Sequence, residues 1–194
     1  MEKLDLFWRH SNCPLRFKLT AMDAVLKSKL LYGLETAQLN PSDIQKLDTF
    51  QLKGLRKILK ITTTYVNRAN TNEYVFEKAN QELRNEDHAN AIIKFSESYL
   101  KRKLLLFQKI VALPNSDPLR QTTFIPDSIK PVIYGTRRVG RPKIRWAIDA
   151  AELYWKKINA LLPYDEQGRP LNIHSPTQGQ IIITAAKNNV FPLR

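Results

Sequence analysis

The chain has 194 residues, 43% of them hydrophobic and 25% charged, which is the composition of a globular domain that can bury an apolar core. Lysine and arginine number 31 against 18 acidic residues, so the formal net charge is +13 and the sequence pI is about 9.9. No apolar run is long enough to span a membrane, and Cys13, the only cysteine, excludes an internal disulfide and a Cys-x-x-Cys metal site.

The excess of positive charge is informative about partners rather than about the fold. Phosphate-rich polymers are the first candidates and acidic membranes the second, and a basic protein with an ordinary solvated surface is the alternative. The lone cysteine fits a reducing compartment, and the N-terminus does not have the pattern of a signal peptide, so we expect an intracellular protein of the nucleus or cytoplasm. A helical pattern begins within a few residues of Met1, and we therefore expect this chain to be part of a longer protein.

Two amphipathic helices are predicted at the start of the chain. The first covers residues 13–37, where apolar side chains recur at spacings of three and four. Asn40 can cap the second helix, Pro41 suits its first turn, and Asp43 favours the positive end of its dipole. Its predicted buried side consists of Ile44, Leu47, Phe50, Leu55 and Ile58. Because the connection between the two helices is short, we expect them to form an antiparallel pair.

Two further helices are predicted in the middle of the chain. After a connecting segment, Thr71 can cap a third helix that ends near Asn85, with Tyr74 and Val75 facing inward. A long fourth helix is expected at residues 88–113, where apolar residues again recur at helical spacing.

Turn-forming residues interrupt the remainder of the chain. Residues 114–140 contain four prolines and two glycines, and we expect them to be extended or irregular. A fifth helix is expected at residues 142–162, followed by a turn-rich linker at 163–175. Residues 176–189 fit a last short helix, although Ile181–Ile183 are equally typical of a strand.

These elements predict an all-α fold, a helical bundle of about five helices with an irregular Pro/Gly-rich segment before the last long helix. We expect a helical domain at residues 1–113, a basic irregular linker at 114–142, and a C-terminal helix with a tail at 143–194. Positive charge is concentrated in two parts of the chain. Residues 1–60 have eleven basic and six acidic side chains, and residues 116–162 have nine and four.

Four lysines of the second helix lie on one side of it. Lys46, Lys53 and Lys60 are seven residues apart, and at 100° per residue Lys57 lies within about 60° of them. No acidic residue follows Asp48 in this helix, whereas an ordinary solvated face usually mixes both signs. The alternative is a solubilising face with no specific partner. The residues that we predict to contact phosphates here are Lys46, Lys53, Arg56, Lys57 and Lys60.

The densest cationic cluster is YGTRRVGRPKIRW, residues 134–146. Its five cations, with no acid among them, are Arg137, Arg138, Arg141, Lys143 and Arg145. Arginine forks match phosphate oxygens, and Pro142 suits the start of a helix whose amides can meet a phosphate. We therefore predict a phosphate-binding site here, and a flexible basic loop is the alternative. Trp146 offers a stacking face but equally fits a core position.

Another basic cluster, Lys101–Lys103, is predicted on the fourth helix. It covers more than one face of that helix. We expect at least one of its members to lay its aliphatic stem over apolar surface.

No catalytic constellation is recognisable in the sequence. Metal-dependent nucleotidyl transfer needs paired carboxylates on one metal pair, whereas the adjacent acids 86–87 and 165–166 lie at helix edges or turns. His10, His88 and His174 are far apart in the sequence and have no partnered carboxylate. Phosphate-loop and nucleophile-elbow motifs are missing as well. We therefore expect no enzymatic activity of this chain, no metal and no cofactor.

Three stretches together resemble a known family. LKSKLLYGLETAQL (26–39), LDTFQLKGLRKILKI (47–61) and RRVGRPKIRW (137–146) are similar, in order and spacing, to elements that follow the polymerase palm in reverse transcriptases of non-LTR retrotransposons. Those enzymes commonly read SKLLYG.E, then LD.FQ...LR.IL.I, then R..GRP..RW. The resemblance spans roughly residues 20–155. The residues that match motif positions are Lys29, Tyr32, Gly33, Leu55, Arg56, Gly140, Arg141, Pro142 and Trp146.

The resemblance implies the thumb and post-thumb region of a LINE-type reverse transcriptase without its palm, with residues 1–113 as a thumb-like domain. In that family this region contacts the template–primer duplex or the element RNA, and the matching residues serve packing or backbone contact. The paired aspartates of the polymerase lie upstream of this region, so RNA-directed DNA synthesis would belong to a longer parent protein. The implied function is a non-catalytic fragment that binds RNA, DNA or a hybrid duplex through its phosphate backbone. The alternative is a structural helical module that docks on the missing palm domain.

Overall fold

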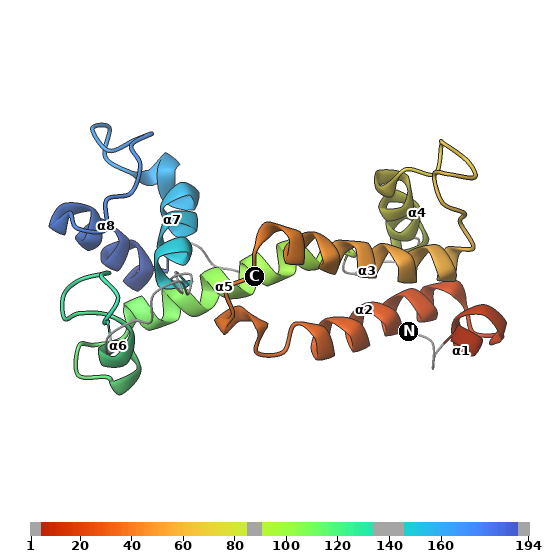
Figure 1. Ribbon diagram of the computed structural model, residues 1–194, viewed down its shortest axis with the longest axis horizontal. Helices are drawn as coiled ribbons and strands as arrows, with labels where there is room; N and C mark the ends of the chain where they lie inside the picture. Colours follow the sequence, from red (N-terminus) through yellow and green to blue (C-terminus); the bar gives the residue numbers. More distant parts are fainter. Residues whose placement is uncertain (1–4, 85–90, 134–145, 190–194) are drawn as a thin grey trace, which may run out of the picture. The chain divides into compact units, whose positions relative to one another are not determined.

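The computed structural model of the protein describes residues 5–84, 91–133 and 146–189 (Figure 1). In these ranges the regular structure is helical, and the one β feature is an isolated bridge between Phe124 and Pro131. The predicted all-α class is confirmed. The helices comprise two more short ones than we predicted, α1 (Asp5–His10) and α6 (Pro118–Thr123).

The chain divides into two compact units, each with a core of its own. Unit 1 consists of residues 1–34 and 39–99, and unit 2 of residues 35–38 and 100–194. One helix, α5 (Phe95–Ala112), contributes to both units, because the division falls after Tyr99. The domain boundaries that we predicted from the sequence lie after residues 113 and 142 instead.

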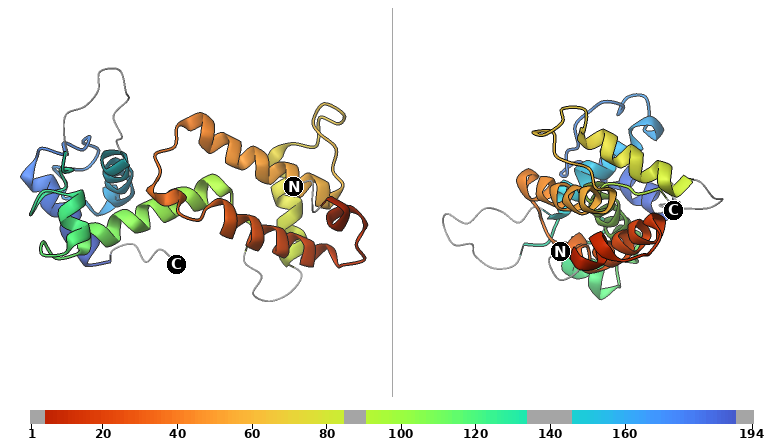
Figure 2. Two further views of the ribbon diagram at one scale, coloured as in Figure 1. Left: turned by 60° about the horizontal axis from the view of Figure 1, so that its bottom comes forward. Right: turned by 90° about the vertical axis from the view of Figure 1, so that its right-hand side faces the viewer.

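Unit 1 is built around an antiparallel helix pair, α2 (Leu15–Leu30) and α3 (Pro41–Leu59), as predicted (Figures 1 and 2). The predicted range 13–37 for the first of them is too long. Leu31 forms its C-cap, and Gly33 adopts φ +69°, a left-handed conformation that ends the helix and suits glycine. The short 3-10 helix η2 (Leu34–Thr36) follows.

The helix starts in unit 1 are the ones that local capping predicts. The Asn40 side chain accepts a hydrogen bond from the Asp43 backbone N–H at 2.8 Å, with Pro41 in the first turn. In α4 (Asn72–Arg84), the Thr71 hydroxyl accepts from the Tyr74 backbone N–H at 3.2 Å. Both predicted starts are thereby confirmed.

The predicted inward orientation of Tyr74 is wrong. Val75 is fully buried, whereas Tyr74 is 39% exposed. Val75, Ala79 and Leu83 recur every four residues and form the buried stripe of α4. Successive residues of a helix point about 100° apart, so Tyr74 lies at the edge of this stripe.

The core of unit 1 gathers side chains from α1, α2, α3 and α4. Its buried members are Trp8, Leu19, Met22, Leu55, Ile58, Val75, Ala79, Leu83 and Ile92. Of the predicted buried side of α3, Leu55 and Ile58 are buried, and Ile44, Leu47 and Phe50 are half-buried. Lys18 is buried as well, and its Nζ donates to the backbone oxygens of Trp8 at 3.1 Å and Ser11 at 2.9 Å. These bonds fasten the end of α1 to α2.

The start of α5 is set by polar side chains of other helices. The Gln51 amide accepts from the Phe95 N–H and donates to the Ile93 oxygen, both at 2.9 Å. Asn80 makes the equivalent pair of bonds to the backbone of Ile92. Asp48 accepts from the Ser96 N–H and hydroxyl at 2.9 and 2.7 Å, and so caps the helix. The predicted start at residue 88 lies outside the described residues, but 91–94 are not helical, so the predicted range begins too early.

Replacing Gln51 with leucine is expected to lower the free energy of unfolding by about 2 kcal/mol, because the buried N–H of Phe95 and the part-buried oxygen of Ile93 lose their partner while the side-chain volume is kept. Gln51 is fully buried. Chemical denaturation measures the change. Gln45→Leu, on the exposed part of the same helix, is the matched control and is expected to have little effect. Equal stability of the two variants would contradict this role of Gln51.

Unit 2 contains the remaining part of α5 together with α6, α7 (Trp146–Ile158), the 3-10 helix η3 (Asn159–Leu161) and α8 (Pro176–Lys187). The prediction of an irregular chain at residues 114–140 misses α6, which Asp117 caps before Pro118. The turn-rich linker is confirmed, and the strand alternative for Ile181–Ile183 is wrong, because Ser175 caps a helix there. The predicted helix start near residue 142 lies outside the described residues.

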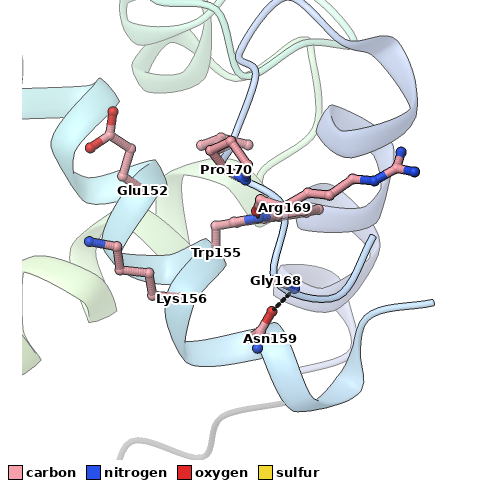
Figure 3. A pocket seen from close by; sticks show the side chains of 8 residues that line it. Glu152, Trp155, Lys156, Asn159, Gly168, Arg169 and Pro170 are labelled. Carbon is pink, nitrogen blue, oxygen red and sulfur yellow. Dashed lines mark hydrogen bonds between the residues drawn. The ribbon is translucent and has the colours of Figure 1, made fainter. Parts of the chain in front are cut away.

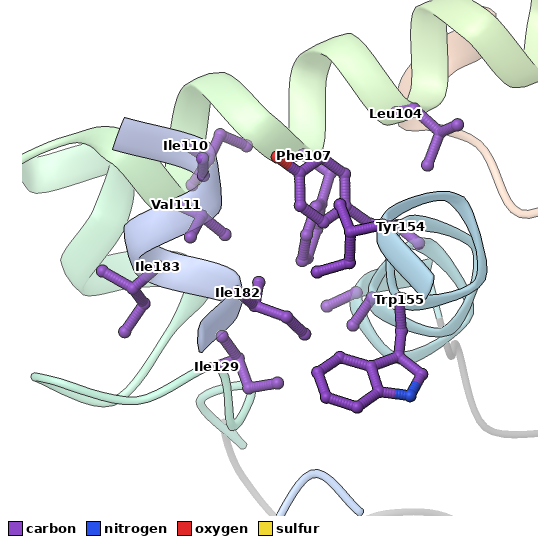
Figure 4. Close-up of a cluster of buried hydrophobic side chains, with 14 of the residues drawn as sticks. Leu104, Phe107, Ile110, Val111, Ile129, Tyr154, Trp155, Ile182 and Ile183 are labelled. Carbon is purple, nitrogen blue, oxygen red and sulfur yellow. The ribbon is translucent and has the colours of Figure 1, made fainter. Parts of the chain in front are cut away.

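The core of unit 2 lies between α5, α7 and α8 (Figure 4). Phe107 occupies its centre and packs against two aromatic rings, those of Phe124 and Tyr154. The buried members of this core are Leu104, Phe107, Ile110, Val111, Phe124, Ile129, Ala147, Ala150, Ala151, Tyr154, Trp155, Ile158, Leu162, Ile182, Ile183 and Ala186. Burial raises the pKa of the Tyr154 phenol to about 12, so this side chain stays neutral at ordinary pH.

A buried arginine organises the chain between α5 and α7. Arg120 is 3% exposed. Its Nη1 donates to the Val111 oxygen at 2.5 Å, its Nε to the Asn115 side-chain oxygen at 3.0 Å, and its Nη2 to the Ser128 oxygen at 3.5 Å. Burial lowers the pKa of Arg120, and the negative charge of Asp127 partly offsets this effect. The guanidinium thus joins the end of α5 to the loop after α6.

Candidate nucleic-acid interface

The four lysines of the predicted basic ridge differ in their surroundings. Lys46 and Lys53 are exposed on α3, and Lys57 is half-buried. Lys46 Nζ lies 2.9 Å from the Asp43 carboxylate, an exposed ion pair of small energetic value. Lys60 is exposed but lies just beyond the helix, in a left-handed C-cap with φ 55°. The ridge therefore offers exposed ammonium groups at Lys46, Lys53 and Lys60.

Arg56, the fifth residue predicted on this surface, binds the protein's own backbone. Its Nη1 donates to the Thr62 oxygen at 2.6 Å, and its Nη2 donates to the Asn70 oxygen at 2.8 Å and the Asn72 side-chain oxygen at 3.2 Å. These donors hold both ends of the loop between α3 and α4. Arg56 therefore positions this loop, and its contact with phosphate stays a prediction. Lys53 and Lys60, on either side of it in the sequence, are exposed.

The second predicted surface falls outside the described residues. This concerns Arg137, Arg138, Arg141, Lys143 and Arg145. Trp146, the first described residue after them, is half-buried, packs against the unit 2 core, and donates its indole N–H to the Glu35 oxygen at 2.6 Å. Of its two predicted roles, the structure thus favours packing. Trp146 anchors the chain at the point where the basic segment joins α7.

One member of the basic cluster Lys101–Lys103 is buried and takes part in a group of polar side chains. Lys103 is 2% exposed, and its Nζ donates to the Gln38 side-chain oxygen at 2.8 Å. The Gln38 amide in turn donates to the Asp149 carboxylate. Burial lowers the pKa of Lys103, and the charge of Asp149 partly offsets this effect. This group of polar side chains fastens residues 35–38 within unit 2.

Unit 2 also has a surface pocket of about 550 Å³ beside α7 (Figure 3). Asn159 accepts from the Gly168 N–H at 2.9 Å, and the Trp155 indole donates to the Arg169 oxygen at 2.8 Å, so the turn after η3 forms one wall. The charges along the pocket are Lys156, Glu152 and Arg169, and the Arg169 guanidinium points away from the other two (Figure 3). This mixture of signs does not form a concentrated anion site.

One feature that we predicted only as a connection is the loop between α3 and α4. Tyr65, at its tip, is 98% exposed, and Val66 is 70% exposed. Arg68 is exposed too. The signal in the sequence that could have marked this segment was a tyrosine in a polar connection that contains Arg68 and no acid.

Among the described residues, no group of three or more histidine, cysteine, aspartate or glutamate side chains is arranged to hold a metal ion. No helix in the described ranges is both long and apolar enough to cross a bilayer. Comparison with protein-family models, with curated proteins and with solved structures gives no match for this chain.

Proposed function

We propose that this chain is a non-catalytic fragment of a retroelement reverse transcriptase that binds template–primer nucleic acid through its phosphate backbone. The observation that carries the proposal is the exposure of Lys46 and Lys53 on α3 and of Lys60 at its C-cap, with no acid in this helix after Asp48. The net charge of +13 and the five cations of residues 137–145 support it. The proposed origin in a reverse transcriptase is supported by the order of the three stretches that resemble that family.

Binding of this kind positions a nucleic acid without reading its sequence. Lysine ammonium groups act as point charges toward phosphate oxygens, which every nucleotide carries. Each neutralised phosphate releases condensed counterions, so the affinity depends on salt. We therefore infer recognition of RNA, DNA or a hybrid duplex by charge, in the nucleus or cytoplasm.

One observation favours the second candidate, a structural module that docks on the missing polymerase palm. Phe17 and Val25 of α2 are 55% and 40% exposed, and Tyr32 just after it is 86% exposed. Where such side chains form one contiguous patch, the patch is typical of a surface that meets another protein. In this case the basic surface would be incidental, and nucleic-acid binding would be weak.

A salt titration tests the proposed function. The affinity for a primer–template duplex is expected to fall linearly with salt on a double-logarithmic plot, with a slope of roughly −0.9 for each phosphate contacted. Fluorescence anisotropy of a labelled duplex measures it. A flat dependence, or no binding at low salt, would overturn the proposal and favour the docking module.

Matched triple replacements then locate the surface. Changing Lys46, Lys53 and Lys60 to glutamine is expected to reduce the salt slope by roughly 3, uniformly across sequences. Changing Arg137, Arg138 and Arg141 to alanine in one variant is expected to reduce the salt slope by the same amount. The control changes three exposed lysines elsewhere, Lys109, Lys157 and Lys187, and removes the same charge. Equal losses in all three variants would indicate a bulk charge effect and contradict the assigned surfaces.

A further inference from the structure

The loop between α3 and α4 is held in one conformation by its own hydrogen bonds. Arg56 clamps its two ends through the backbone oxygens of Thr62 and Asn70. The Asn70 amide donates to the Thr62 backbone oxygen at 3.1 Å and to the Thr62 hydroxyl at 2.9 Å. A loop fastened in this way loses little conformational entropy when it binds a partner.

The tip of the loop is a tight turn. The N–H groups of Val66 and Asn67 both donate to the Thr63 oxygen, at 3.0 and 3.1 Å. The Asn67 side-chain oxygen accepts from the Ala69 N–H at 3.0 Å. The turn places Tyr65 in solvent with 98% of its surface exposed, and Figure 1 shows the loop projecting from the ends of α3 and α4. The phenol ring therefore has both faces open on a preformed support.

Between Asp48 and Glu73, the charged residues along the chain have one sign. Residues 49–72 contain five cations, Lys53, Arg56, Lys57, Lys60 and Arg68, and no acidic residue. Lys60 and Arg68, which flank Tyr65 in the chain, are both exposed. The contrast is Tyr164 in unit 2, which is 94% exposed but is followed directly by two acids, Asp165 and Glu166. An open aromatic face within a cationic stretch is the combination that suits a nucleobase on a phosphate chain.

We propose that Tyr65 stacks on an unpaired nucleobase while Lys60 and Arg68 contact the phosphates on either side of that base. The inference rests on the proposed function and narrows its ligand to a single-stranded segment. Bases inside a duplex are stacked on their neighbours, so only an unpaired base presents a free face to the ring. Stacking on an aromatic side chain tolerates any base, which fits recognition that does not read sequence.

The test uses the full chain and three labelled probes: a single-stranded DNA of about twelve nucleotides, its RNA counterpart, and a blunt DNA duplex. Tyr65→Ala is expected to bind the preferred single strand about tenfold more weakly and the duplex as tightly as the wild type. Tyr65→Phe and Tyr65→Trp are expected to retain single-strand binding, because stacking needs the ring and not the hydroxyl. A 2-aminopurine base in the single strand reports stacking directly, through fluorescence quenching that Tyr65→Ala diminishes.

Tyr164→Ala is the matched control, since it removes an equally exposed tyrosine from an acidic surrounding; it is expected to change neither affinity nor quenching. Wild-type single-strand affinity in Tyr65→Ala overturns the inference, and so does an equal loss on single strand and duplex. In both outcomes the proposed function stands as long as duplex binding keeps its salt dependence. If the wild type binds none of the three probes at low salt, both proposals are overturned together.

Discussion

Replacing Phe107 with alanine is expected to lower the free energy of unfolding of unit 2 by about 3 to 5 kcal/mol. Phe107 lies on α5 and is fully buried, with its ring against Tyr154 of α7. Its ring lies edge-on to Phe124, with centroids 5.9 Å apart and planes at 88°, and tilted by 49° against Tyr154 at 5.6 Å. Truncation removes both ring contacts and leaves a cavity that the surrounding helices fill only in part.

Hydrogen exchange of the α7 and α8 amides, with thermal unfolding alongside, measures the loss for unit 2 separately from unit 1. Phe17→Ala is the control, because that ring is 55% exposed on α2 in unit 1 and its removal should change stability by no more than about 0.5 kcal/mol. Unchanged exchange protection in Phe107→Ala would show that the core of unit 2 is not organised around this ring.

The second large effect is expected from Arg120→Met, a loss of about 3 kcal/mol. Methionine keeps much of the side-chain length but none of the three donated bonds, and it leaves the buried oxygen of Val111 at the end of α5 without this partner. Arg120→Lys is expected to fall between wild type and Arg120→Met, because one ammonium cannot reproduce the planar fork that reaches Val111, Asn115 and Ser128.

Chemical denaturation of both variants measures this effect, with Arg169→Met as the control. The Arg169 side chain is 62% exposed and lies 3.9 Å from Glu166, so its replacement should matter little. If Arg120→Met and Arg169→Met were equally stable, the guanidinium of Arg120 would not be the tie between α5 and the loop after α6.

The proposed function rests on surfaces that can be examined one at a time. The lysines of α3 and the ring of Tyr65 belong to the same unit, and we propose different contributions to binding for them. In these proposals the lysines set the salt dependence on any phosphate chain, whereas the ring sets a preference for unpaired bases. Measuring the salt slope and the single-strand preference in the same variants therefore separates the two.

Elements whose causes are local could be predicted from the amino-acid sequence. The start of α3 could be predicted from Asn40, Pro41 and Asp43 alone, because capping, the fixed proline φ and the helix dipole all act within one turn. Helical spacing of apolar residues likewise predicted α2 and most of α5, and the cap at Thr71 predicted the start of α4. The fold class followed from these helices. The exposed lysines of α3 follow from the same periodicity.

The partners of the buried polar side chains could not be predicted in this way. Gln51 and Asp48 fix the start of α5 although they lie 44 and 48 positions before their partners Phe95 and Ser96. Arg56, which we expected to meet phosphate, meets the loop that carries Tyr65, and Lys103 is buried against Gln38. A cationic side chain looks the same in the sequence whether it faces water, a phosphate or a backbone oxygen. The difference arises because burial must be matched by hydrogen bonds, and the acceptors come from segments that only folding brings together.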